Sequence, residues 1–267
     1  MAGKKIALLL MLLLCASAVA EDGNNASRSD VNATLLLGPG AVVLLKPYAG
    51  MHPTVYPYLV SLFIYDRFYI SIDTVGYRLL ANRGASAKPG RMSWYFDVIG
   101  KWRTDGYNSG DSDELEGMHN RNKTFDVGGE FGVSGDWGSV TTSLVTDVLG
   151  VDDGQEIRVV YAKPFKNPFD VNNLKISPSV GLAWQSKNLV DYYYGVRSDE
   201  VRAGRPAYDP GPAVNWLWGV DANYRLNDRW TLLAGFTYYW FDSEIRNSPI
   251  VSRNYAISII AGAMYRF

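Results

Sequence analysis

The stretch that decides the fold is NYAISIIAGAMYRF, which runs from Asn254 to Phe267. Every second residue from Tyr255 onward is apolar, and an aromatic ring stands at each end of this row. The alternate positions are smaller and more mixed, and they include Ser258 and Gly262. Because successive side chains of a strand point to opposite faces, the pattern predicts a β-strand with one face in an apolar medium.

The same alternation recurs in segments that begin at Met92, Phe125, Ile176, Trp216 and Trp230. In several of them aromatic residues stand at both ends of the apolar row, as in the aromatic girdles of lipid-facing strands. These strands of 10–14 residues are longer than the usual globular strand of about 5–6 residues. Strands in lipid must pair every backbone group, so they close into a barrel. A soluble β-sandwich, whose apolar faces meet in a core, is the alternative.

Counting back from Phe267 gives eight strands to Arg91, and three more segments lie at 35–47, 56–65 and 68–80. A bacterial barrel with both termini in the periplasm needs an even number of strands. We therefore expect an all-β fold, a closed antiparallel transmembrane β-barrel of about twelve strands, with an additional break near Asp73 and Thr74; ten strands is the alternative. The long connections are expected outside the cell and the tight turns in the periplasm. These long connections are 104–122, 188–212 and 242–253.

The N-terminal segment predicts export. Lys4 and Lys5 precede an apolar run from Ile6 to Leu14, and Ala18-Val19-Ala20 follows as a cleavage site, so residues 1–20 form a secretory signal peptide. Cys15 raises the alternative of a lipoprotein signal, but Leu14 stands where such signals usually have a small residue. Residues 21–33 are a polar leader and 34–267 the barrel, which predicts the outer membrane of a Gram-negative cell.

Composition and motifs exclude several classes of function. The 26 Lys+Arg and 27 Asp+Glu nearly balance, which argues against nucleic acid as a partner. The two histidines, His52 and His119, lie in expected loops without a recurring serine and acid beside them. The acidic stretch 105–117 departs from the spacing of an EF-hand. We therefore predict no catalytic site, no cofactor and no metal site.

The second face of the predicted strands carries charges of both signs. Such charges line a water-filled path or pair with one another and fill the barrel. We expect a mostly filled or narrow interior. The predicted interior charges are Asp97, Lys101, Arg103, Asp126, Glu130, Asp221 and Arg225.

Several short motifs follow in order along the last part of the chain: YYGV from Tyr193, GRPAY from Gly204, YRL from Tyr224, and SPIV from Ser248. With them the sequence resembles the MltA-interacting protein (MipA/OmpV) family of outer-membrane proteins, densely over roughly the last 90 residues. The chain departs from the family pattern in the early stretch YAGMHPTVYPY. The motif residues of the expected external loop are Tyr193, Tyr194, Gly195, Gly204, Arg205, Pro206 and Tyr208.

The final residues carry a second resemblance. Tyr265 and Phe267 look like the C-terminal signal that the outer-membrane barrel assembly machinery reads on its substrates.

The family resemblance implies a non-enzymatic scaffold that couples a murein-degrading lytic transglycosylase to a peptidoglycan synthase, in contact with outer-membrane lipid. A narrow channel or small-solute-binding barrel is one alternative, and a surface adhesin that acts through residues 188–212 is another. Pro206, Pro210 and Pro212 restrict the backbone of that loop. We expect it to be ordered and either to cap the barrel mouth or to form a recognition surface.

Overall fold

The computed structural model describes residues 33–82 and 92–267. The predicted signal peptide at 1–20 and the leader up to residue 32 lie outside the described residues. No helix in the described part of the chain is long and apolar enough to cross a membrane.

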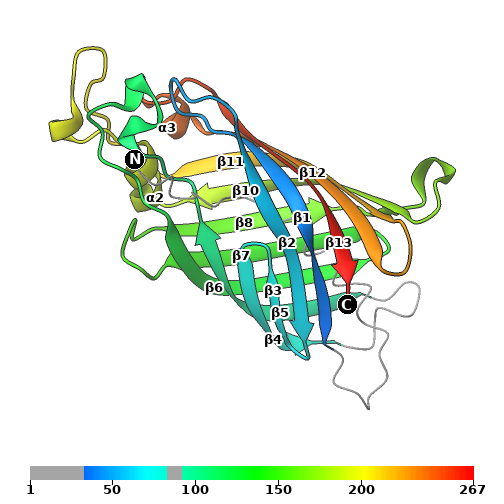
Figure 1. The fold of residues 1–267 in the computed structure, drawn as a ribbon. Helices are drawn as coiled ribbons and strands as arrows, with labels where there is room; N and C mark the ends of the chain where they lie inside the picture. Colours follow the sequence, from blue (N-terminus) through cyan, green and yellow to red (C-terminus); the bar gives the residue numbers. More distant parts are fainter. Residues whose placement is uncertain (1–32, 83–91) are drawn as a thin grey trace.

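The described chain forms a closed antiparallel β-barrel (Figure 1). Each main strand pairs with its neighbours along the chain, and the last strand pairs with the first, so the predicted closure is confirmed. The twelve wall strands are β1 Thr34–Leu45, β2 Thr54–Tyr65, β3 Phe68–Ser71, β4 Thr74–Ala81, β5 Ser93–Arg103, β6 Thr124–Gly135, β7 Gly138–Asp147, β8 Gln155–Ala162, β10 Leu174–Gln185, β11 Ala213–Arg225, β12 Trp230–Trp240 and β13 Tyr255–Arg266.

Two short elements explain the strand count. The predicted break near Asp73 is confirmed, because β3 ends at Ser71 and β4 starts at Thr74. The two-residue strand β9, Phe165–Lys166, pairs only with β10. It extends the edge of β8 along β10 after an interruption and is not a separate wall strand.

Alternation sets the two faces of the wall as predicted. On β5, Trp94 and Trp102 are exposed on the outside, whereas Asp97 between them is fully buried inside. On β13, Ile259 is exposed and the neighbouring Ile260 is buried. The outer surface is therefore an apolar band of the kind that faces lipid.

The interior has two chemically different halves. On β1, β2, β12 and β13 the inward side chains are mainly apolar and pack together. On β5 to β8 they are mainly charged or polar. The apolar half consists of Leu36, Val42, Leu44, Tyr58, Val60, Leu62, Leu233, Ile260 and Met264.

The connections differ between the two ends of the barrel. We call the end with connections 46–53, 104–123, 148–154, 186–212 and 241–254 the long-loop end. The opposite end, with connections 66–67, 136–137, 163–173 and 226–229, is the short-turn end, where β1 begins and β13 ends. Connection 82–92 also belongs to the short-turn end, and its residues 83–91 lie outside the described part. The three connections predicted to be long, 104–122, 188–212 and 242–253, all lie at the long-loop end, and the tight turn 72–73 between β3 and β4 points toward the same end.

Candidate functional site

The long-loop end is closed by a packed layer of loops, which we call the cap. The helix α2, Lys187–Tyr194, lies within it, and Leu189, Val190 and Tyr193 on this helix are almost completely buried. Tyr48 from the first loop stacks on Tyr194 at 5.7 Å between ring centroids. Ile245, on the short helix α3 (Ser243–Arg246), is also fully buried in the same cluster. Loops far apart in sequence thus share one apolar core above the barrel.

A buried ion pair holds this cap together. Arg121 Nη1 and Nη2 each lie 2.9 Å from one oxygen of the Glu200 carboxylate. Arg121 also donates to the carbonyl oxygen of Tyr192. Burial raises the pKa of Glu200, but the hydrogen bonds from Arg121 and from the backbone N–H groups of Arg197 and His119 outweigh it and bring the pKa to about 2. The pair joins the loop 104–123 to the loop 186–212.

The predicted motif residues of the external loop are structural parts of the cap. Tyr193 and Tyr194 belong to its core, and Gly195 ends helix α2. Gly204 has φ of +80°, a backbone conformation that favours glycine, in the turn between Arg202 and Arg205.

The remaining motif residues follow this turn. Arg205 is buried and donates to the carbonyl oxygens of Glu114, Glu116 and Glu200. Pro206 is exposed, and the hydroxyl of Tyr208 donates to the carbonyl oxygen of Glu244 at 3.0 Å.

Three of the seven predicted interior charges, Asp97, Arg103 and Asp126, meet in paired networks. Arg103 contacts Asp126 at 2.6 Å and Glu156 at 3.2 Å, and Arg158 contacts the other Glu156 oxygen at 2.6 Å. Asp97 accepts hydrogen bonds from Arg78 and from the hydroxyl of Tyr69. From the sequence, Arg103 and Asp126 were predicted as interior charges, but Glu156 and Arg158, which complete their network, were not.

The other predicted interior charges differ in their surroundings. Glu130 accepts a hydrogen bond from the Tyr95 hydroxyl at 2.8 Å. Lys101 and Asp221 are buried. Arg225 departs from the prediction, because β11 ends at this residue and its side chain is exposed at the short-turn rim, near Asn173.

Among the described residues, the segment 165–173 between β8 and β10 projects from the short-turn end (Figure 1). Phe169 at its tip is 85% exposed, and Phe165 and Val171 are exposed as well. Phe169 and Asp170 both have φ of +59°, which is uncommon for residues other than glycine. An exposed phenylalanine on a backbone of this kind is typical of a contact site, because strained residues cluster where function requires them.

The two histidines lie in the long loops, as predicted. His119 is about half exposed and its Nε2 lies 3.2 Å from an Asp199 carboxylate oxygen. In the described ranges, no group of three or more His, Cys, Asp or Glu residues has the geometry to hold a metal ion. The predicted C-terminal signal residues Tyr265 and Phe267 form an aromatic pair with ring centroids 5.0 Å apart.

Comparison with known proteins gives a consistent result. The family model described as "MltA-interacting protein MipA" matches residues 37–267. The chain is 25% identical to the MltA-interacting protein of Escherichia coli K12, over 86% of this chain and 89% of that protein. It is 27% identical to the outer membrane protein OmpV of Vibrio cholerae, over 76% of this chain and 74% of OmpV. With Omp26La, an outer membrane protein of Vibrio anguillarum, it shares 29% identity over 60% of this chain and 61% of that protein.

Proposed function

The chain belongs to the MltA-interacting protein MipA family of outer membrane barrels, and from this premise we propose that it is a non-enzymatic scaffold. In this proposal its short-turn end faces the periplasm and holds a murein-degrading transglycosylase close to a peptidoglycan synthase. The name of the Escherichia coli relative supports the first partner. The synthase is the second partner that the family resemblance implies.

One observation carries the proposal: Phe169 is 85% exposed on a segment that projects from the short-turn end. Aromatic side chains that fill a partner's pocket contribute a large share of binding energy at protein interfaces. The fully described turns 66–67, 136–137 and 226–229 at this end are short and offer little surface. The segment 165–173 is therefore the partner contact in our proposal.

The experiment is a pull-down with the full chain, purified in detergent and immobilised, from membrane and periplasmic extracts. Bound proteins are identified by mass spectrometry and assayed for hydrolysis and synthesis of murein. We expect recovery of a lytic transglycosylase, with at least a tenfold loss for Phe169→Ala and no loss for Asn172→Ala in the same segment. If the unaltered protein recovers neither enzyme, the scaffold proposal fails. If Phe169→Ala binds equally well, the contact site is wrong.

The closed long-loop end favours the scaffold proposal over the alternative that the barrel is a channel. Paired charges line one half of the interior, mainly apolar side chains line the other, and the long loops cover one end. We therefore expect no steady conductance in planar bilayers, and a stable open current would favour the channel.

A surface adhesin is a second candidate, because the outer part of loop 186–212 projects beyond the cap (Figure 1). Its residues Val201 and Arg202 are exposed. Replacing Val201 with Glu leaves the Arg121–Glu200 pair in place, and loss of binding to host-surface proteins in this variant would favour adhesion.

A further inference from the structure

Positive side chains mark one part of the barrel mouth at the short-turn end. On β9, Lys166 lies directly opposite Lys175 of β10, so the two side chains are on the same face of the sheet. Ser177, two residues along β10 from Lys175, is buried inside the barrel, so this face is the inner one. Lys166, which is exposed, thus lies on the inner side of the mouth.

Two arginines continue this row on neighbouring strands. Arg225 ends β11 and shares the inner face with Asp221, which is buried four residues earlier. Arg266 ends β13 and shares the inner face with Met264, which is buried two residues earlier. Both arginines are exposed. We call Lys166, Arg225 and Arg266 the cationic rim.

Neighbouring carboxylates do not balance the charge of the cationic rim. The stretches 163–175 and 225–229, together with Arg266, contain six Lys or Arg residues and two Asp residues. Among the described residues, none of the three rim side chains forms an ion pair with a carboxylate. Arg225 Nη2 lies 3.4 Å from Asn173 Oδ1, which is a neutral contact. The rim can therefore attract an anionic ligand.

The opposite part of the inner rim has small, uncharged side chains. Ser93 of β5 pairs with Ser134 of β6, and Ser139 of β7 pairs with both Ser134 and Ala162 of β8. An anion at the mouth is thus attracted to the side formed by β9, β11 and β13.

The spacing of the cationic rim indicates the kind of ligand. Four inter-strand steps separate β9 from β13 in the order β9–β10–β11–β12–β13. At about 4.8 Å per step, this arc is roughly 19 Å long. One small anion does not reach all three cations, whereas six residues of extended chain span about 20 Å. An extended peptide with several carboxylates therefore matches the arc.

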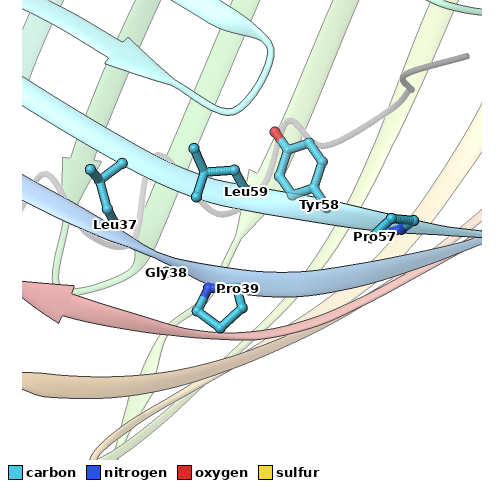
Figure 2. A pocket seen from close by; sticks show the side chains of 6 residues that line it. All are labelled: Leu37, Gly38, Pro39, Pro57, Tyr58 and Leu59. Carbon is cyan, nitrogen blue, oxygen red and sulfur yellow. The ribbon is translucent and has the colours of Figure 1, made fainter. Parts of the chain in front are cut away.

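A lipid head group matches the cationic rim less well, because lipid lies against the outer face of the wall. That face is apolar, and the part of it on β1 and β2 in Figure 2 is lined by Leu37, Gly38, Pro39, Pro57, Tyr58 and Leu59, none of which is charged. The cationic rim is on the inner face instead. Its ligand therefore comes from the aqueous side of the short-turn end.

The cationic rim adjoins the projecting segment. Lys166 is part of segment 165–173, and the backbone N–H of Arg225 donates to the carbonyl oxygen of Asn173 at 3.0 Å. Phe169, at the tip of the same segment, is 85% exposed. A partner that covers Phe169 thus also reaches the cations. Its complementary surface combines an apolar pocket with carboxylates.

We propose that the cationic rim binds an acidic, extended peptide segment of the periplasmic protein that contacts Phe169. This inference deepens the scaffold proposal and rests on it, because the segment belongs to the same partner. The contact at Phe169 contributes affinity, and the contacts between carboxylates and cations contribute specificity and faster association.

Fluorescence anisotropy with a fluorescein-labelled hexaglutamate peptide tests the site, with the full chain in nanodiscs of phosphatidylcholine. Hexaglutamate should bind, and hexaglutamine should not. Raising the salt concentration from about 0.05 M to about 0.5 M shortens the screening length and should weaken binding at least about tenfold. Absence of hexaglutamate binding, or binding that does not change with salt, would overturn the site.

Two matched double variants locate the site. Lys166→Gln with Arg225→Gln removes two rim cations and should weaken hexaglutamate binding at least about tenfold. Lys187→Gln with Arg202→Gln removes the same charge from exposed residues at the long-loop end and should leave binding unchanged. Far-UV circular dichroism checks that both variants keep the barrel. Equal losses in the two variants would show that only net charge matters and would overturn the placement.

The pull-down assay separates this inference from the scaffold proposal. The rim variant should lose the transglycosylase, as Phe169→Ala does. If it recovers the enzyme as well as the unaltered protein, the acidic segment is refuted and the scaffold stands. If the unaltered protein binds hexaglutamate but recovers neither enzyme, the scaffold fails, and the assignment of the peptide to its partner fails with it. Binding of soluble murein fragments as tight as that of hexaglutamate would overturn the choice of a protein segment.

Discussion

The two ends of the barrel differ in how far they bury their apolar side chains. At the long-loop end, the four connections 46–53, 104–123, 186–212 and 241–254 bury apolar residues in the cap, and Tyr48, Tyr193 and Ile245 have essentially no exposed surface. At the short-turn end, the segment 165–173 leaves Phe169 85% exposed. Burial at the cap contributes to stability, whereas exposure of a large aromatic ring does not. From this difference we infer that packing stabilises the closed cap, whereas the projecting segment is accessible to a partner.

Among the variants that test this contrast, removal of the buried ion pair in the cap should have the largest effect on the free energy of unfolding. Arg121→Ala leaves the Glu200 carboxylate buried without its partner, which should cost about 3–5 kcal/mol in the free energy of unfolding. Guanidinium unfolding followed by tryptophan fluorescence measures this. The control is Lys187→Ala, because the Lys187–Asp209 pair is exposed and its loss should lower the free energy of unfolding far less than the loss of the buried pair. Equal effects of the two variants would contradict a stabilising role for the cap.

Truncation of the cap core should have a similar or somewhat smaller effect. Leu189 is 1% exposed, so Leu189→Ala removes buried apolar contacts and should destabilise by about 2–5 kcal/mol. Limited proteolysis between residues 186 and 212 should become faster. Val201→Ala in the same loop, where the side chain is exposed, should stay within about 0.5 kcal/mol; if it matches Leu189→Ala, the loop is not packed as described.

Acid should weaken the cap through Glu200. Its pKa of about 2 in the folded chain lies below the ordinary value of about 4.3 for glutamate. The stabilisation is therefore present above pH 4.3 and is lost as the pH falls toward 2. At pH 3 the loss should be about 2 kcal/mol relative to pH 7. The measurement is unfolding at both pH values, and Glu200→Gln should show a smaller difference; an unchanged difference would assign the acid effect to other groups.

The smallest effect on stability should come from the projecting segment. Phe169→Ala removes a side chain that is already exposed, so the free energy of unfolding should change by less than about 0.5 kcal/mol. The same unfolding assay measures it. A loss above about 2 kcal/mol would show that Phe169 is part of the barrel's packing. The contrast between a buried cap and an exposed projecting segment would then not hold.

Sequence reasoning predicted the fold because the physical signal is local. In lipid-facing strands every second residue lies on the same face, so a short stretch of sequence is enough to identify the apolar row. Trp94 was therefore assigned to the outer face and Asp97 to the inner face, as the structure has them. The break at Asp73 was also predicted, because twelve strands require it. The apolar half of the interior was not predicted, since β1 and β2 are apolar on both faces and alternation then gives no direction.

The cap network was not predictable in the same way. Arg121 and Glu200 are far apart in the chain, and neither has a local pattern that marks it as buried; the loop packing decides their contact. The three asparagines and the proline of the projecting segment are turn signals, but the exposure of Phe169 follows from the left-handed backbone, which the sequence does not encode in a simple motif.

The pairing of β13 with β1 has a consequence for the order of assembly. Leu36 on the first strand pairs with Arg266 on the last strand. The ladder that closes the barrel therefore joins strands that are far apart in the sequence. Contacts between such distant residues form slowly, because the whole intervening chain must be brought together first. Until that moment the growing sheet has two free edges, each able to recruit a foreign strand. The chain is thus most vulnerable to aggregation just before its final seam forms.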